Sequence, residues 1–157
     1  MLQRTAPTIR ELLSYRLHQV ANLLSRGAEM RYRREFGVSL WEWRTVALLG
    51  GAGEPQSLNE LARAAGMDKG QMSRVVSGLT RRRIIFREAD ANDARGIRLS
   101  LTRSGKALYQ KLIRAAAERN SAFLGCLSVK ERECLEQAMT KLAQEARGFI
   151  QKEKQVR

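Results

Sequence analysis

The sequence predicts a mainly α-helical protein with a small β-wing, a winged helix-turn-helix set between long N- and C-terminal helices. Two short amphipathic segments meet at a glycine within residues 57–81, and a basic hairpin pattern follows at residues 84–101. Apolar residues recur at helical spacing for several turns on either side of this block. A length of 157 residues suits one domain with a substantial core.

The first helix is expected to start after Thr8, a plausible N-cap, and to stop near Gly37, which suits a left-handed C-cap. Its apolar face consists of Leu13, Leu17, Val20 and Leu24, with Leu12, Leu23 and Met30 beside them. Ser39 and Glu42 form a capping-box pattern for a second helix through about Leu49. The loop expected after it contains Gly50, Gly51, Gly53 and Pro55.

The central block predicts two further helices joined by a tight turn. The third helix runs over residues 58–65, and Gly66 permits the positive φ that such a turn needs. Asp68 can cap the fourth helix, whose buried face recurs at i, i+3, i+4 and i+7, as Met72, Val75, Val76 and Leu79. Its opposite face carries Gly70, Arg74, Ser77 and Arg81, flanked by Gln71 and Ser73.

The hairpin predicts a wing. Residues 84–86 form a short strand, residues 90–96 a turn-rich tip, and the return strand alternates through Ile97, Leu99 and Leu101. An arginine at the tip, Arg95, can enter a minor groove. Asp93 can hold that guanidinium or brace the loop; the alternative is a solvated salt bridge of little consequence.

Two helices close the chain. Thr102 caps a fifth helix carrying Leu108, Leu112, Ala115 and Ala116. Ser128 with Glu131 opens a sixth, which carries Leu135, Ala138, Met139, Leu142, Ala146 and Phe149. This apolar surface exceeds what a small winged module can cover. Residues 1–157 are therefore expected to form one domain, with residues 38–103 as the winged module and residues 1–37 and 104–157 as dimerisation helices. The alternative is a monomer whose terminal helices fold back on the module.

The charge favours a polyanionic partner. The formal net charge is +13 and the pI near 10.8, and ten basic residues against four acidic ones lie between Asp68 and Lys106. Nucleic acid and an anionic membrane surface both fit. No secretory signal pattern opens the chain and no apolar run is long enough to span a bilayer, so we expect a cytoplasmic protein without a membrane partner.

The predicted DNA-binding residues follow from the fourth helix, its surroundings and the wing. Gln71 and Arg74 can pair with base edges, serines can reach phosphates, and Gly70 lets the backbone approach a groove. The alternative is that these polar residues form an ordinary solvated helix face. The full set is Ser57, Lys69, Gly70, Gln71, Ser73, Arg74, Ser77, Arg81, Arg83, Asp93, Arg95 and Arg98.

The stretch from Asp93 to Thr102 resembles the D-x-R-x-x-x-L-x-L-T wing motif of the MarR/SlyA transcription regulators. The similarity covers most of the chain and includes Trp43 at a core aromatic position. It implies an obligate homodimer on a pseudo-palindromic double-stranded operator. It also implies a repressor, and many repressors of this family leave their operator on binding a phenolic or aromatic carboxylate. By this match Gln71, Ser73 and Arg74 correspond to the DNA-contacting face and Arg95 to the wing arginine. Where the family usually has glycine before the first wing strand, this chain has Arg83.

A ligand site is expected from four residues, by analogy with the cleft that family members use: Arg16, His18, Trp41 and Arg44. Trp41 and Arg44 share a face of the second helix with Leu48, and Arg16 borders the apolar face of the first. A half-buried arginine needs an anionic partner, which is either a glutamate of the fold or the carboxylate of a ligand stacked on a tryptophan. His18, the single histidine, is either structural or part of the ligand site.

Other functions receive less support. Cys126 and Cys134 form neither a disulfide framework nor a metal motif and are expected to pack as small hydrophobes, so no cofactor is predicted. The sequence has no evident nucleophile–base pair, phosphate-cradling glycine loop or metal set, and a single histidine, so we expect no enzyme. The remaining alternative is a basic architectural or RNA-binding protein without an effector, which would discriminate poorly among DNA sequences.

Overall fold

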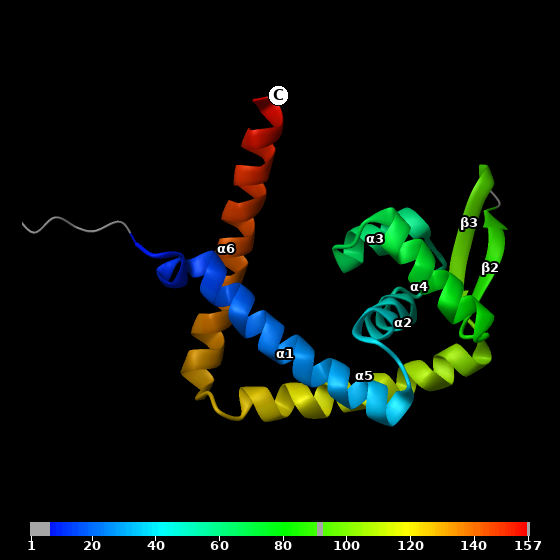
Figure 1. Ribbon diagram of the computed structural model, residues 1–157, viewed down its shortest axis with the longest axis horizontal. Helices are drawn as coiled ribbons and strands as arrows, with labels where there is room; N and C mark the ends of the chain where they lie inside the picture. The colour runs from blue at the N-terminus through cyan, green and yellow to red at the C-terminus, as the bar shows by residue number, and fades with distance from the viewer. Residues whose placement is uncertain (1–6, 91–92, 157) are drawn as a thin grey trace, which may run out of the picture. The chain divides into compact units, whose positions relative to one another are not determined.

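The computed structural model describes the backbone of residues 7–90 and 93–156, and the side chains of residues 7–90 and 96–156. Figure 1 shows a mainly helical chain with one small antiparallel sheet, which confirms the predicted fold class. The elements are η1 (Ile9–Glu11), α1 (Leu13–Phe36), α2 (Leu40–Gly51), β1 (Gln56–Ser57), α3 (Leu58–Ala65), α4 (Lys69–Arg81), β2 (Ile85–Asp90), β3 (Asp93–Leu101), α5 (Arg103–Leu124) and α6 (Val129–Gln155).

The chain divides into two compact units, Met1–Ile113 and Arg114–Arg157. The first holds the winged module together with α1 and the start of α5. The second holds the end of α5 and all of α6. No helix in the described part of the chain is long and apolar enough to cross a membrane.

Serine caps and left-handed glycines set the helix boundaries as expected. Ser39 Oγ accepts a hydrogen bond from the Glu42 N–H at 3.2 Å, and Ser128 Oγ accepts one from Glu131 at 3.3 Å. In both cases the glutamate carboxylate accepts the serine N–H in return, at 2.8 Å. Gly37 ends α1 at a φ of 63°, and Gly66 ends α3 at a φ of 66°. These positive values suit glycine because it has no Cβ to clash with the following carbonyl.

The start of the first helix differs from the prediction. Thr8 begins only the 3₁₀ turn η1, where its N–H donates to the Glu11 carboxylate at 2.7 Å. Leu12 is then extended, with φ −68° and ψ 133°, so α1 begins anew at Leu13. Thr8 is an N-cap as predicted, but it caps only the single turn η1. The long helix α1 begins separately after Leu12.

The loop after α2 starts later than expected, since Gly50 and Gly51 are still helical. A Cβ on Gly50 would lie 2.5 Å from the Tyr109 ring on α5. Glycine at this position therefore permits a close approach between two helices within the first unit. The sequence marked Gly50 as a turn residue because a packing glycine and a loop glycine look alike without the partner ring.

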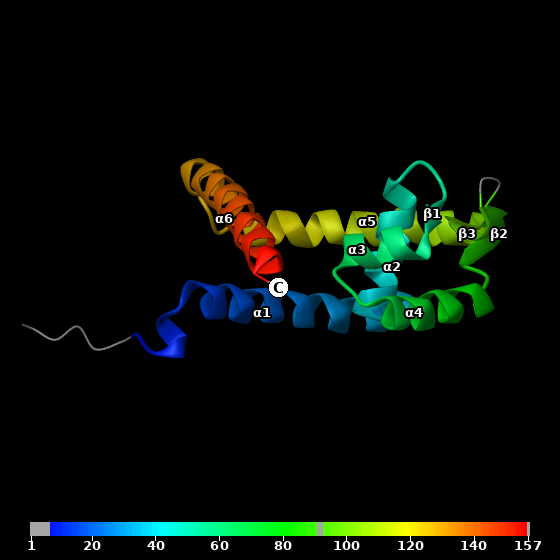
Figure 2. The same cartoon turned by 90° about the horizontal axis from the view of Figure 1, so that it is seen from above.

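The core of the first unit lies where α1, α2, α3 and α4 meet the sheet. Figures 1 and 2 show α2, α3 and α4 packed together, with the β2–β3 hairpin beyond the end of α4. The Tyr32 ring is fully buried against Trp43, with 5.1 Å between the ring centroids. Trp43 thus occupies the core aromatic position that the family resemblance implied. Among the described residues of this unit, the other apolar side chains with no exposure are Val38, Val46, Met72, Val76, Leu79 and Leu112.

The sheet has three antiparallel strands in the order β1-β3-β2, so β3 is central. The short strand β1 was not expected because two residues carry no readable alternation. The wing strands also reach further than predicted: β2 continues to Asp90 and β3 begins at Asp93, and these two residues face each other. The predicted tip at residues 90–96 is therefore strand at Asp90 and from Asp93 onward, with an irregular register between Ala89 and Asp90. Residues 91 and 92 of that tip lie outside the described residues.

The second unit buries little of its surface. No residue of α6 is buried, and both free cysteines, Cys126 and Cys134, are exposed. The expectation that these cysteines pack as small hydrophobes was therefore wrong for the single chain. The apolar side chains around them have no core within their own unit to join.

Candidate nucleic-acid interface

The turn between α3 and α4 is built by two residues with different roles. Gly66 closes α3 in the left-handed region, and Met67 N–H donates to the Ala62 carbonyl at 2.9 Å. Asp68 then opens α4, its carboxylate accepting the Gln71 N–H at 2.8 Å. An acidic cap also complements the partial positive charge at a helix N-terminus. Together these contacts fix the direction in which α4 leaves the turn.

Helix α4 divides sharply into a buried and an exposed face. Met72, Val76 and Leu79 have no solvent exposure, as their spacing predicted, whereas Val75, predicted for the same face, is half-buried. On the other side Gln71, Arg74 and Arg81 are exposed, and Ser73 and Ser77 are half-buried. Lys69 and Gly70 are exposed at the N-terminal end. The exposed predicted contacts on α4 therefore include three cations, Lys69, Arg74 and Arg81, and the Gln71 amide.

A cavity of about 490 Å³ lies between the N-termini of α3 and α4 and the wing. Two predicted contacts, Ser57 and Lys69, line it together with Asn59 and Arg87, which the sequence reasoning did not single out. Arg87 is an exposed residue of β2, opposite Leu99. Its signal was available, because Ile85 and Arg87 share one side of the strand by period two.

Arg83 stands where the resemblance expected glycine, and its backbone has a φ of 57°. Among the described residues it is the one non-glycine with a positive φ. Its carbonyl accepts hydrogen bonds from the Thr102 hydroxyl at 2.7 Å and from the Ser104 hydroxyl at 2.8 Å. These two bonds hold a conformation that costs a residue with a Cβ roughly 1–2 kcal/mol. The side chain itself is exposed.

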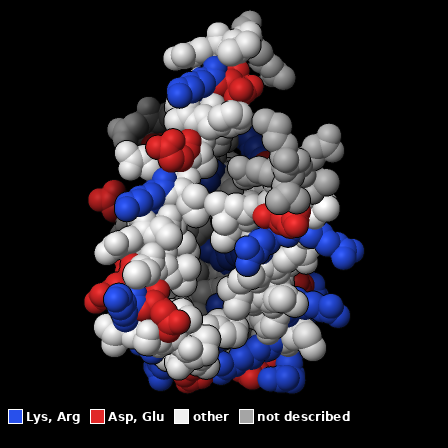
Figure 3. Space-filling model, turned by 90° about the vertical axis from the view of Figure 1, so that its left-hand side faces the viewer, with Lys and Arg blue, Asp and Glu red and all other residues white. Residues whose placement is uncertain are grey.

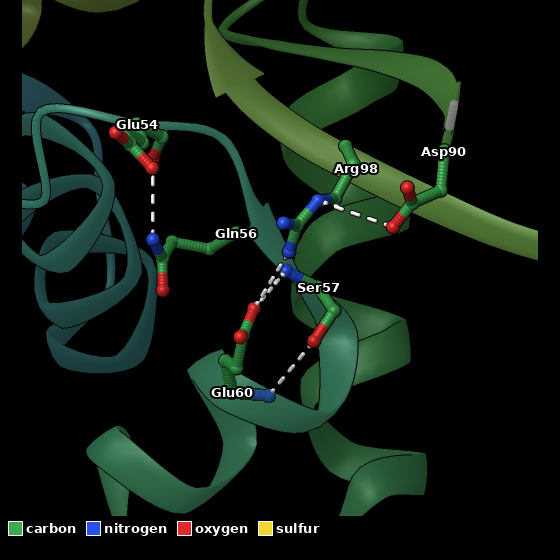
Figure 4. Close-up of polar contacts among 6 residues, drawn as sticks. All are labelled: Glu54, Gln56, Ser57, Glu60, Asp90 and Arg98. Atoms are coloured by element: carbon green, nitrogen blue, oxygen red, sulfur yellow. Dashed lines mark hydrogen bonds and ion pairs between the residues drawn. The ribbon is translucent and has the colours of Figure 1, made fainter. Parts of the chain in front are cut away.

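Two arginines near the predicted contacts already have acidic partners. Arg82 Nη1 lies 2.9 Å from Glu42 Oε1, which connects the end of α4 to the first turn of α2. Arg98 Nη1 lies 3.0 Å from Glu60 Oε2, and Arg98 Nε lies 3.2 Å from Asp90 Oδ2 (Figure 4). The structure thus places Arg98, a predicted DNA contact, between two carboxylates.

Ser57 is held as firmly. Its N–H donates to Glu60 Oε2 at 2.7 Å, and its hydroxyl accepts the Glu60 N–H at 3.2 Å, forming the cap of α3 (Figure 4). These hydrogen bonds, more than the nearby Arg98 charge, hold the pKa of Glu60 below its ordinary value. The Glu60 carboxylate is therefore ionised at neutral pH. The side chains of the wing residues Asp93 and Arg95 lie outside the described residues.

The predicted ligand residues are only partly brought together. The guanidinium carbon of Arg44 lies 4.8 Å from the centre of the Trp41 ring, and Arg44 Nη2 donates to the Ser25 hydroxyl at 3.4 Å. Arg16 is exposed and precedes Ser25 by about two and a half helical turns, on the opposite side of α1. His18 is exposed and hydrogen-bonded to Asn22 at 2.9 Å. A single chain therefore joins Trp41 with Arg44 and leaves Arg16 and His18 elsewhere.

Arg44 is half-buried, and the contacts described for it are with a ring and a hydroxyl. The sequence left two anionic partners open for such an arginine, a glutamate of the fold or the carboxylate of a ligand. Among the described side chains, no glutamate pairs with Arg44. Arg44 also lines a cavity of about 350 Å³ with Trp43, Ala47, Leu48, Ala64 and Ala65. The arrangement offers a cation, an indole face and apolar walls at one place.

Comparison with known proteins agrees with this architecture. Residues 36–96, from the end of α1 to the wing, match the model of the MarR family. A MarR/EmrR family transcriptional regulator from Acinetobacter sp. ADP1 has the same fold, with a TM-score of 0.82, 25% identity, and coverage of 90% of this chain and 99% of that one. Residues 36–96 thus match the MarR family, and the fold of most of the chain is that of a MarR/EmrR family transcriptional regulator.

Two further structures are similar. A probable transcriptional regulator from Pseudomonas aeruginosa is 28% identical, with a TM-score of 0.71 and coverage of 86% and 99% of the two chains. The MepR–DNA complex of S. aureus is 23% identical, with a TM-score of 0.75 and coverage of 85% and 98%, and shows a likeness of fold. No curated protein sequence matches the chain.

Proposed function

We propose that this regulator is a homodimeric repressor that reads a pseudo-palindromic DNA operator with α4 and the wing and leaves it on binding a small aromatic carboxylate. The observation that carries the DNA-binding part is the division of α4. Met72, Val76 and Leu79 hold one face in the core, and the other face presents Gln71 and Arg74 to solvent. Such a helix can enter a major groove, where an amide and a guanidinium pair with base edges.

The remaining predicted contacts support positioning on the phosphate backbone. Lys69 and Arg81 lie at opposite ends of α4, Ser73 and Ser77 lie along it, and Arg83 follows it. Cations and hydroxyls at such places fix the register of a helix in the groove without reading sequence. Arg95 is assigned to the minor groove on the wing motif alone.

The dimer is supported by apolar side chains that a single chain leaves exposed. On α1 these include Leu17, Leu23 and Met30, and on α6 they include Met139 and Phe149. On the face drawn in Figure 3, uncharged surface separates side chains of both signs, with no continuous basic field. Such a mixed surface suits a contact between copies better than a contact with DNA.

Specific binding is tested by titrating the full-length protein into a duplex that it selects from a random pool, and into random duplex. Half-sites about 10 bp apart and a slope of log K against log salt near −7, for about eight phosphates neutralised, are expected. Equal affinity for both duplexes at physiological salt would favour the architectural alternative. Reduced transcription from a promoter carrying the selected duplex separates a repressor from an activator.

The roles of the two arginines are separated by substitution. Arg74→Ala should cost about 1–3 kcal/mol of binding free energy and relax preference at one position of each half-site. Arg95→Ala should weaken binding most on A·T-rich flanks. Arg82→Ala is the matched control, because it removes the same charge from a side chain that is paired with Glu42. Base reading is wrongly assigned to α4 if Arg74→Ala and Arg82→Ala lose affinity equally on every sequence.

The effector is tested with salicylate as the probe. A flat anion can pair with the Arg44 guanidinium beside the Trp41 indole, so tryptophan fluorescence should fall and operator affinity should drop by roughly 5–150-fold. Linkage requires operator DNA to weaken salicylate binding by the same factor. Arg44→Ala should abolish both effects, whereas Arg16→Ala tests whether α1 contributes. Release of the operator that survives Arg44→Ala unchanged places the ligand elsewhere.

A further inference from the structure

The guanidinium of Arg98 joins three segments of the winged module. Arg98 lies in the central strand β3, Glu60 in the first turn of α3, and Asp90 at the end of β2. Two different nitrogens make the two contacts, Nη1 with Glu60 at 3.0 Å and Nε with Asp90 at 3.2 Å (Figure 4). Using both nitrogens defines the orientation of the planar group as well as its position.

The carboxylate on the helix side is itself fixed. Glu60 Oε2, the oxygen that meets Arg98, also accepts the Ser57 N–H at 2.7 Å. Ser57 is in turn the residue opposite Arg98 in the pairing of β1 with β3. The contact therefore ends on the cap of the helix-turn-helix at one side and on the outer wing strand at the other.

We propose that Arg98 is a positioning residue that fixes the wing relative to the helix-turn-helix, and that it does not itself contact DNA. This inference rests on the proposed operator binding. Reaching a phosphate would require the guanidinium to leave two carboxylates, and both negative charges would then lie near the DNA backbone without the Arg98 cation between them. The Arg98 side chain is 33% exposed, and such partly exposed pairs add little to folding stability. Its effect should therefore appear in DNA affinity through the placement of the wing.

Glu60→Gln and Glu54→Gln form a matched pair for the first test. A glutamine at position 60 can still complete the capping box but cannot form the ion pair. Glu54 is a nearby exposed acid whose described contact uses its backbone carbonyl, which accepts from Gln56 Nε2 (Figure 4). Both changes remove one negative charge. On the duplex that the wild-type protein selects, Glu60→Gln should bind about 3–10-fold more weakly, while Glu54→Gln binds equally or slightly more tightly. Tighter binding by Glu60→Gln would mean that a freed Arg98 contacts DNA, and overturns the proposal.

The second test asks whether Arg98 acts through the wing. Arg98→Met should weaken binding in the wild-type background and add little in an Arg95→Ala background, because positioning matters only while the wing makes its contact. A direct phosphate contact predicts full additivity, and a further decrease of about 0.9 in the magnitude of the salt slope in the Arg95→Ala background. Full additivity with that change of slope overturns the proposal.

A third measurement needs no DNA. Hydrogen–deuterium exchange of residues 97–101 in the full-length protein should be faster in Glu60→Gln than in Glu54→Gln, because β3 loses its ion pair with the first turn of α3. Equal exchange in the two variants overturns the positioning role. If the wild-type protein selects no preferred duplex, the proposed function fails. The exchange measurement still decides whether Arg98 positions the wing, because it uses no DNA.

Discussion

Helices α4 and α6 are both amphipathic, but only α4 buries its apolar face within the chain. Met72, Val76 and Leu79 have no exposure, whereas Leu135, Met139 and Leu142 on α6 stay 42%, 52% and 37% exposed. Helix α1 shows both behaviours. Its buried residues, Ala28 and Tyr32, lie in its second half, and the leucine side chains of its first half are exposed. An apolar stripe predicts that a helix face is buried, but it does not identify the surface that buries it.

The difference has an energetic consequence. Burying a large apolar side chain contributes about 1.5–3 kcal/mol, so the buried stripe of α4 stabilises the winged module substantially without a partner. Helix α6 has no such contribution in a single chain. We therefore expect the stability of the winged module to depend little on protein concentration, and the stability of the terminal helices to depend on it strongly.

The largest expected effect is at the proposed dimer interface. Leu142→Glu places a charge that must be desolvated on association, which costs several kcal/mol and should shift the dimer dissociation constant by more than about a hundredfold. Sedimentation velocity measures the shift. Gln144→Glu, two residues away, is the control for added charge. An intact Leu142→Glu dimer would move the interface to another surface and weaken the contrast with α4.

Next is a pair of identical truncations in the two helices. Met72→Ala leaves a cavity in a closed core and should lower the free energy of unfolding by about 2–5 kcal/mol at every protein concentration. Met139→Ala should lower the melting temperature mainly in the concentration range where dimers dissociate. Calorimetry over a hundredfold concentration range compares them. Equal, concentration-independent losses would mean that α6 is packed within its own chain.

A smaller effect is expected where α4 meets the wing. Arg83→Gly removes the left-handed strain and should raise the free energy of unfolding by about 1 kcal/mol or less, after the greater chain entropy of glycine is subtracted. Arg83→Ala keeps the strain and serves as the control. Both variants lose the side chain, so both should bind operator equally weakly. A gain in stability from Arg83→Ala would mean that the arginine side chain, and not the left-handed backbone, lowers the free energy of unfolding.

The smallest effect concerns caps that both regions share. Hydrogen bonds from Ser57 hold the pKa of Glu60 below its ordinary value of 4.5, and hydrogen bonds from Ser128 do the same for Glu131. A depressed carboxyl pKa contributes stability that is full above 4.5 and is lost as pH falls through the lowered folded-state pKa. Melting temperatures should therefore fall below pH 4.5. Glu131→Gln should lessen this loss, and an unchanged pH profile in that variant would contradict the assignment.

Local chemistry in the sequence was sufficient for several helix ends, though not for the start of α1 or the end of α2, and for the buried residues Met72, Val76 and Leu79 of α4. A serine followed three residues later by glutamate, a glycine that can turn left-handed, and apolar spacing of three and four each act within about one or two turns. Such signals predicted the caps at Ser39 and Ser128 and the turn at Gly66. They also placed Gln71 and Arg74 on the exposed side of one helix.

The tertiary structure decided everything that depends on partners far apart in the chain. Gly50 lies against a ring 59 residues later that leaves no room for a Cβ, and Arg98 is held by a carboxylate 38 residues earlier. Arg44 meets the Ser25 hydroxyl where the sequence left a fold glutamate or a ligand carboxylate open. Capping and helical periodicity are short-range and can be read in order along the chain. Ion pairs and close packing are set by distances that exist only once the helices and strands have come together.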